Sequence, residues 1–144
     1  MTDINRSALM PYSASFMYQI VNNVEAYPDF LPWCGDVKVH HQDRTSMEAS
    51  ILMKKGKLNH WFKTRNLMRP DQSIEMTLLD GPFKKLHGYW HFTPIAESGS
   101  KIELALNFEM GKSLALIFIG PIFTQIANSM VDSFCRRAEA LNEP

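Results

Sequence analysis

The 144-residue sequence is poor in cysteine, with two residues, Cys34 and Cys135, that lie far apart along the chain. Such a pair predicts two free thiols rather than a disulfide framework, as is usual in a reducing cytoplasm. The first ten residues, MTDINRSALM, also lack the basic and apolar stretches of a secretion signal. We therefore expect a cytoplasmic protein.

An excess of charge of one sign is absent as well, because fifteen Lys and Arg residues balance fifteen Asp and Glu residues. No global field attracts the chain to nucleic acid, and we expect no DNA partner. The most apolar run, LALIFIGPIFTQIANSM, is interrupted by Gly120 and Pro121 and then by polar residues, so it is too broken for a membrane-spanning helix. The length indicates a single domain over residues 1–144.

Sequence motifs of catalysis are missing too. There is no glycine-rich phosphate loop, no zinc-protease helix motif and no Gly-x-Ser-x-Gly elbow. Cys34 has no neighbouring histidine to activate it, and His87 and His91 have no carboxylate or thiolate at ligand spacing. We therefore expect neither an enzyme nor a metal site, and no catalytic cofactor.

What the sequence does contain is regular alternation. From residue 36 to 109, apolar and polar residues alternate with a period of two, and turn residues separate the runs. This pattern predicts an antiparallel sheet with one dry face and one wet face. Residues 3–10 predict a first strand, and Ser13 is a suitable N-cap for a short helix that fades near Asn22.

A long helix is expected from Ser113 onward, where apolar residues recur at helical spacing, and Pro121 should kink this helix or divide it. Its apolar stripe is Leu116, Ile119, Phe123, Ile126, Met130, Phe134, Ala138 and Leu141. The fold class is therefore α+β: a curved antiparallel sheet of six to seven strands around a long C-terminal helix, with one or two short helices after the first strand. One helix covers only part of such a sheet, which leaves room for a cavity.

The segment AYPDFLPWCGDV, residues 26–37, carries a large apolar surface together with two prolines. Pro28 and Pro32 prevent a long helix or a central strand from running through it. We interpret the segment as a cover over the cavity. The alternative is a proline-rich connector whose aromatic rings plug the core.

Three stretches resemble the START-like coenzyme Q-binding family, and within it the bacterial ribosome association toxins. They are PYSASFMYQIVNNVEAYPDFLPWC, DGPFKKLHGYWHF and GPIFTQIANSMVDSFCRRA, and the resemblance extends from Arg6 to Ala138. The resemblance implies a helix-grip fold with an apolar tunnel that binds ubiquinone or another polyprenyl lipid.

The resemblance also implies which residues meet the lipid. The cover would consist of Tyr27, Phe30, Leu31 and Trp33. The tunnel wall would consist of Phe62, Met76, Leu78, Trp90, Phe92, Leu106 and Phe108 from the sheet and Phe123, Ile126, Met130 and Phe134 from the helix. Which of these contact ligand and which pack the core stays open at this point.

Basic residues cluster around one predicted turn and on the strand that follows. They are Lys54, Lys55, Lys57, Lys63, Arg65 and Arg69. On the outer face of the sheet they would form a stripe able to contact ribosomal RNA phosphates or lipid headgroups. The alternative is a solvated face whose charge is balanced elsewhere.

Three functions follow from these observations. The first is non-enzymatic binding of a quinone or similar lipid in support of respiration. A cytoplasmic protein with this function would also contact the inner membrane peripherally. The second is a factor that docks on the large ribosomal subunit and blocks subunit association. The third, a cyclase or hydratase, rests on fold analogy alone.

Overall fold

The computed structural model describes residues 2–142. In chain order the elements are β1 (Thr2–Met10), α1 (Ala14–Asn22), the 3₁₀ turn η1 (Val24–Ala26), α2 (Tyr27–Phe30), β2 (Cys34–Gln42), β3 (Ser46–Lys55), β4 (Leu58–Arg69), β5 (Ser73–Asp80), β6 (Phe83–Ile95), β7 (Gly99–Met110) and α3 (Leu114–Asn142). No helix in this range is long and apolar enough to cross a membrane.

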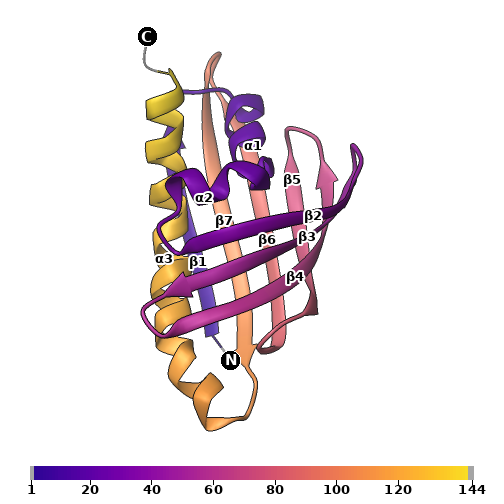
Figure 1. The fold of residues 1–144 in the computed structure, drawn as a ribbon. Helices are drawn as coiled ribbons and strands as arrows, with labels where there is room; N and C mark the ends of the chain where they lie inside the picture. Colours follow the sequence, from indigo (N-terminus) through magenta and orange to yellow (C-terminus); the bar gives the residue numbers. More distant parts are fainter. Residues whose placement is uncertain (1, 143–144) are drawn as a thin grey trace.

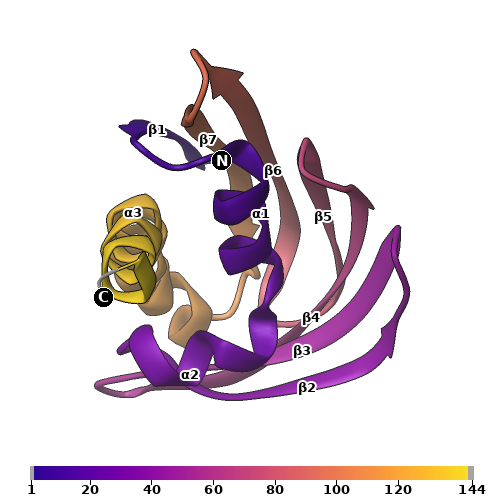
Figure 2. The same cartoon turned by 90° about the horizontal axis from the view of Figure 1, so that it is seen from above.

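The seven strands form one antiparallel sheet in the order β1-β7-β6-β5-β4-β3-β2. Figures 1 and 2 show that the sheet curves into a deep trough, that α3 closes its open side, and that α1 and α2 cover one end. This is the α+β helix-grip arrangement, and the predicted fold class is confirmed. Because β1 and β2 are the two edge strands, the short helices between them span the trough from one edge to the other.

Alternation along the strands decides which face is buried, as the sequence predicts. In β3 the side chains of Met47, Ala49, Ile51 and Met53 are buried, while the residues between them are not. Strand β7 behaves in the same way, with every second side chain buried from Ser100 to Phe108. Burial of one continuous apolar face drives the sheet to wrap around α3.

Helix α1 begins where the sequence predicts. The Phe16 amide donates a hydrogen bond to Ser13 Oγ at 3.1 Å, so Ser13 satisfies one of the amide groups left unpaired at the helix N-terminus. The buried face of α1 packs Tyr18 edge-on against Phe92 of β6, with ring centroids 5.6 Å apart. This contact anchors the helix over the end of the trough.

Helix α3 is a single helix with Pro121 inside it, so the alternative of two separate helices is wrong. Figure 1 shows that the orange start of α3 leans away from the axis of its later turns, as expected where proline removes one hydrogen bond. The apolar stripe is buried from Ile119 to Ala138 except for the half-buried Met130, and Leu141 is 52% exposed. The last turn of the helix therefore extends past the sheet.

The proline-rich segment is more regular than we expected. Residues Tyr27–Phe30 form the short helix α2. Pro28 lies in its first turn, where backbone amides make no hydrogen bond within the helix, so the missing amide hydrogen of proline costs nothing there. The Leu31 amide closes the turn by donating to the Tyr27 carbonyl at 2.9 Å. Strand β2 then starts at Cys34, inside the segment that the sequence analysis interprets as a cover.

Candidate functional site

A small cavity of about 50 Å³ lies between the inner face of the sheet, α3 and the segment 24–33. Seven of the predicted tunnel-wall residues line it, and all come from the sheet or from α3: Phe62, Met76, Trp90, Leu106, Phe123, Ile126 and Met130. Tyr27 and Trp33 of the predicted cover also line it. The cavity holds a few water molecules at most, so the interior is almost filled by side chains.

The other predicted wall residues pack elsewhere in the core. Phe92 contacts Tyr18, Phe108 contacts Phe123 at 4.7 Å between centroids, and Leu78 is only half-buried. Phe134 is fully buried against Trp90, with the ring centroids 5.4 Å apart. These side chains position the cavity wall rather than form it.

The cover residues divide in the same way. Tyr27, Leu31 and Trp33 are as buried as the core, and the Tyr27 hydroxyl donates to the Val21 carbonyl. Burial raises the pKa of the Tyr27 phenol, which therefore remains a neutral hydrogen-bond donor. Phe30 is half-buried and meets Phe134 edge-on at 5.5 Å between centroids. Three of the four cover residues are thus fixed in the core, and only Phe30 reaches the surface.

Two buried polar residues face the cavity from β4, and the sequence analysis missed both. Thr64 and Asn66 are 4% and 6% exposed, and Thr64 Oγ1 donates to Asn66 Oδ1 at 3.0 Å. No hydrogen bond from the Asn66 amide nitrogen is found within residues 2–142, and Asn66 lines the cavity. The signal was available, because both residues share the parity of Phe62 and Met68, which are buried on the same strand.

A much larger open groove of about 530 Å³ lies on the other side of the cavity wall. Its apolar lining comes from Phe30, Pro32, Trp33, Ile126 and Ala140, and its polar lining from Lys55, Ser129, Ser133, Arg136 and Arg137. Trp33 and Ile126 line both the groove and the cavity. These two side chains are the wall that separates the two spaces.

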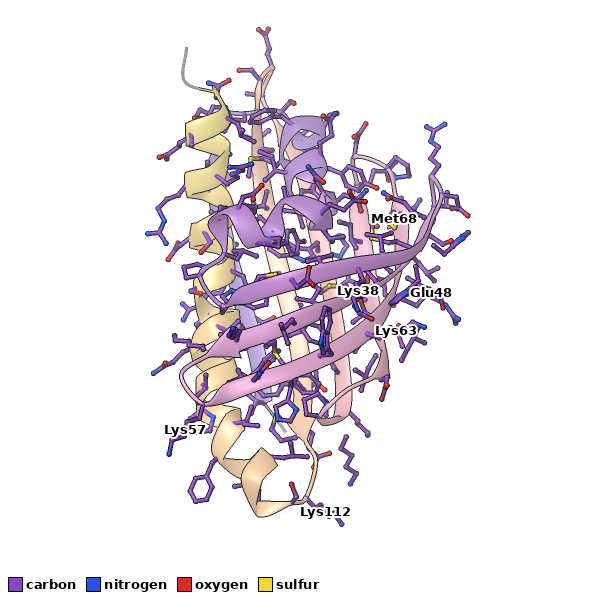
Figure 3. All side chains as sticks on the ribbon, in the orientation of Figure 1. Lys38, Glu48, Lys57, Lys63, Met68 and Lys112 are labelled. Atoms are coloured by element: carbon purple, nitrogen blue, oxygen red, sulfur yellow. The ribbon has the colours of Figure 1, made fainter. Side chains whose placement is uncertain are left out.

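The predicted basic stripe does not form one surface. Lys55 turns toward the groove on the α3 side. Figure 3 shows Lys57 at one end of the β3–β4 hairpin and Met68, the neighbour of Arg69, at the far end of β4. Strand β4 is twelve residues long, so at about 3.3 Å per residue its two ends lie on the order of 35 Å apart.

The middle of the outer face is a compact mixed patch, which we call the outer patch: Lys38, Trp61 and Lys63, with Arg65 and Glu48 beside them. Lys38 and Lys63 both stand opposite Ser50 in the sheet register, and Lys38 Nζ lies 4.9 Å above the Trp61 ring centroid. Arg65 pairs with Glu48 at 3.1 Å. Trp61 is 39% exposed, and the sequence analysis did not single it out.

The remaining reactive side chains have other contacts. His87 Nε2 lies 3.0 Å from Glu75 Oε2, and the His91 ring stacks on Tyr89. No group of three metal-ligating side chains occurs among residues 2–142. Burial raises the pKa of the Cys34 thiol to about 11, so this thiol stays protonated at neutral pH.

A curved antiparallel sheet, a long C-terminal helix that closes it and an apolar interior with a few polar groups define a START-like helix-grip protein. Two solved structures have this fold: a START superfamily protein from Mycobacterium smegmatis (TM-score 0.78, 17% identity, 97% of this chain and 99% of that one) and the Zhui aromatase/cyclase of a Streptomyces species (TM-score 0.84, 12% identity, 96% and 93%). At these identities the likeness concerns the fold alone.

The sequence comparisons define the family. A family model described as polyketide cyclase / dehydrase and lipid transport matches residues 10–135, and the chain belongs to this family. It is 46% identical over 97% of both chains to the ribosome association toxin RatA of Pseudomonas aeruginosa. It is 23% identical to the mitochondrial coenzyme Q-binding protein coq10 of Schizosaccharomyces pombe, over 92% of this chain and 84% of that protein. The resemblance inferred from the sequence is confirmed.

Proposed function

We propose that this protein is a ribosome-association factor that binds the large ribosomal subunit and interferes with subunit joining. The observation that carries the proposal is the 46% identity over 97% of both chains to a protein named as a ribosome association toxin. The match covers nearly the whole length of both chains.

The outer patch supports this proposal with suitable chemistry. Lys38 and Lys63 can contact RNA phosphates, and the partly exposed indole of Trp61 beside them can stack on an unpaired base. Arg65 is partly neutralised by Glu48, so it contributes less to the field of the patch. Because the net charge of the whole chain is zero, RNA contact would depend on local basic surfaces such as this one.

Co-sedimentation with isolated large subunits tests the proposal. The double variant Lys38→Glu/Lys63→Glu should bind at least tenfold more weakly and show a smaller salt dependence, since about one unit of slope is lost for each phosphate contact. Lys112→Glu is the control, because Lys112 is exposed and lies well away from the patch (Figure 3). Failure of the wild-type protein to co-sediment would refute ribosome association, while equal binding by the double variant would exclude only the outer patch.

We propose as a second function that the interior binds a hydrophobic ligand, with ubiquinone or another polyprenyl lipid as the expected class. The cavity supports this, because its lining is apolar except for Thr64 and Asn66, which could hydrogen-bond a carbonyl head. At about 50 Å³ it must widen to admit a prenyl chain. Met76 and Met130 line the cavity, and their flexible side chains lower the free energy needed to widen it.

Quenching of tryptophan fluorescence by ubiquinone tests ligand uptake. Trp33 and Trp90 line the cavity, whereas Trp61 lies on the outer face, so the Trp61→Phe variant reports on the interior with less background. Saturable quenching in this variant supports the proposal, and the absence of quenching refutes it for quinones. A cyclase activity has only the fold in its support, because the aromatase/cyclase neighbour is 12% identical.

A further inference from the structure

We propose that the open groove between Pro32 and α3 binds the anionic head of an amphiphile, such as a lipid with a phosphate or diphosphate group. The apolar part of this ligand would lie against Phe30, Trp33 and Ile126. The inference deepens the proposed ligand-binding function and rests on it. It specifies a charged ligand class where the interior cavity alone would suit a neutral one.

The first argument is charge. Lys55, Arg136 and Arg137 line the groove, and no carboxylate lines it. None of the three cations takes part in an ion pair within the part of the chain that the structure describes. Three unpaired cations around one groove repel one another in the empty protein, and an anion that binds there relieves this repulsion. Two guanidinium groups also suit the oxygens of a phosphate, which they can contact in a bidentate way.

The second argument is an unsatisfied donor. Trp33 is 5% exposed, and its indole Nε1 has no hydrogen-bond partner among residues 2–142. A buried donor without an acceptor is costly, and such groups are rare in folded proteins. Because Trp33 lines the groove, an oxygen of the ligand head could accept this hydrogen bond. The Ser133 side chain, 8% exposed, lines the same groove and offers a further hydroxyl donor.

The third argument is that the charged groups border an apolar surface. The Phe30 ring lies under the Arg137 guanidinium, with its centroid 5.0 Å from Cζ. Trp33 and Ile126 form the wall between groove and cavity, so a chain attached to the bound head would lie directly on that wall. The groove, at about 530 Å³, is large enough for a head with several methylene groups. A free anion would leave the apolar part of this surface uncovered.

Isothermal titration of the full chain with farnesyl diphosphate, farnesol and inorganic diphosphate separates head from tail. We expect farnesyl diphosphate to bind at least tenfold more tightly than either of the other two. The double variant Lys55→Gln/Arg137→Gln should lose at least tenfold in affinity for farnesyl diphosphate and none for farnesol. Lys57→Gln is the matched control, because Lys57 is an exposed lysine two positions from Lys55 that does not line the groove.

Trp33→Phe tests the role of the unpaired indole N–H group. It keeps an aromatic ring in the wall and removes the N–H group, so affinity for farnesyl diphosphate should fall about ten- to a hundredfold further than affinity for farnesol, as expected for one hydrogen bond to a charged acceptor. Unchanged diphosphate binding in this variant, with loss in the double variant, would remove Trp33 from the site and overturn that part of the assignment.

Other outcomes overturn the inference and distinguish it from the function on which it rests. Equal affinity for farnesol and farnesyl diphosphate would refute the anionic head while leaving hydrophobic ligand binding intact. Inorganic diphosphate as tight as farnesyl diphosphate would show a simple anion site. Tighter binding of a short single-stranded RNA that competes with farnesyl diphosphate would assign the groove to nucleic acid. No binding of farnesyl diphosphate, farnesol or ubiquinone would refute both proposals together.

Discussion

The interior cavity and the outer groove share a wall, yet they differ in almost every physical property. The cavity measures about 50 Å³, is more enclosed than the groove and is apolar except for one hydrogen-bonded pair. The groove measures about 530 Å³, is open to solvent and carries three cations. Only Trp33 and Ile126 belong to both.

This difference indicates how the two sites could cooperate. Ligand pockets usually measure about 300–1,000 Å³, so the groove has the size of a preformed site and the cavity does not. A polar head could bind without rearrangement, whereas a long apolar tail would have to displace side chains from the shared wall. The order of events would then be head first and tail second.

The largest effect should come from the ring on which the cavity wall rests. Phe134 is 0% exposed and packs edge-on against Trp90, Tyr27 and Phe30. Phe134→Ala should lower the free energy of unfolding by about 3–5 kcal/mol, measured by urea denaturation. Phe30→Ala should cost clearly less, because Phe30 is half-buried at the groove. Similar losses for both variants would show that Phe30 contributes to the core as much as Phe134 does, and that the groove surface is part of the core.

Much of this fold was predictable because burial imposes a simple rule on strands. Wherever one face of a sheet is dry, every second residue must be apolar, and this fixed the inner face of β3, β6 and β7 from the sequence alone. The N-cap at Ser13 was predictable for a similarly local reason, since its side chain satisfies an amide three residues away.

The parts that were not predictable depend on tertiary packing. Thr64 and Asn66 are polar at inward positions, which a search for apolar alternation passes over, and only their mutual hydrogen bond makes them tolerable there. Lys55 was assigned to the outer stripe, and its position beside Arg136 follows from the docking of α3, which no local pattern encodes. Packing also keeps α3 continuous through Pro121 despite the local cost.

The next largest effect concerns the polar pair in the cavity. Thr64→Val keeps the shape of the side chain but leaves Asn66 Oδ1 without its donor, so it should cost about 1–3 kcal/mol of stability. Replacing both residues, Thr64→Val with Asn66→Leu, should recover part of that loss, because no polar atom is then left unpaired. Chemical denaturation of the two variants gives the comparison, and a double variant less stable than Thr64→Val alone would contradict it.

Filling the cavity should separate the two sites functionally. Ala49 is 2% exposed and lines the cavity, so Ala49→Leu places new methyl groups in the space that a tail would need. Binding of an uncharged prenyl ligand should weaken at least tenfold, about 1.4 kcal/mol, while inorganic diphosphate, which needs only the groove, should bind as in wild type. The measurement is titration calorimetry with both probes. If diphosphate binding also fell, anion binding in the groove would depend on the packing of the interior, and the two sites would not be independent.

The smallest effects on the free energy of unfolding should come from the cations of the groove. Arg136 is exposed, and it stands near two other cations, so Arg136→Gln relieves repulsion and should leave the free energy of unfolding unchanged or slightly higher. Arg137→Gln also loses the contact with the Phe30 ring and should cost about 0.5–1 kcal/mol. Thermal unfolding of the two variants at low and high salt tests this, because added salt should stabilise wild type more than Arg136→Gln if the cations repel one another. A loss of several kcal/mol in either variant would mean that these arginines hold α3 in place, and the groove would then be a structural seam.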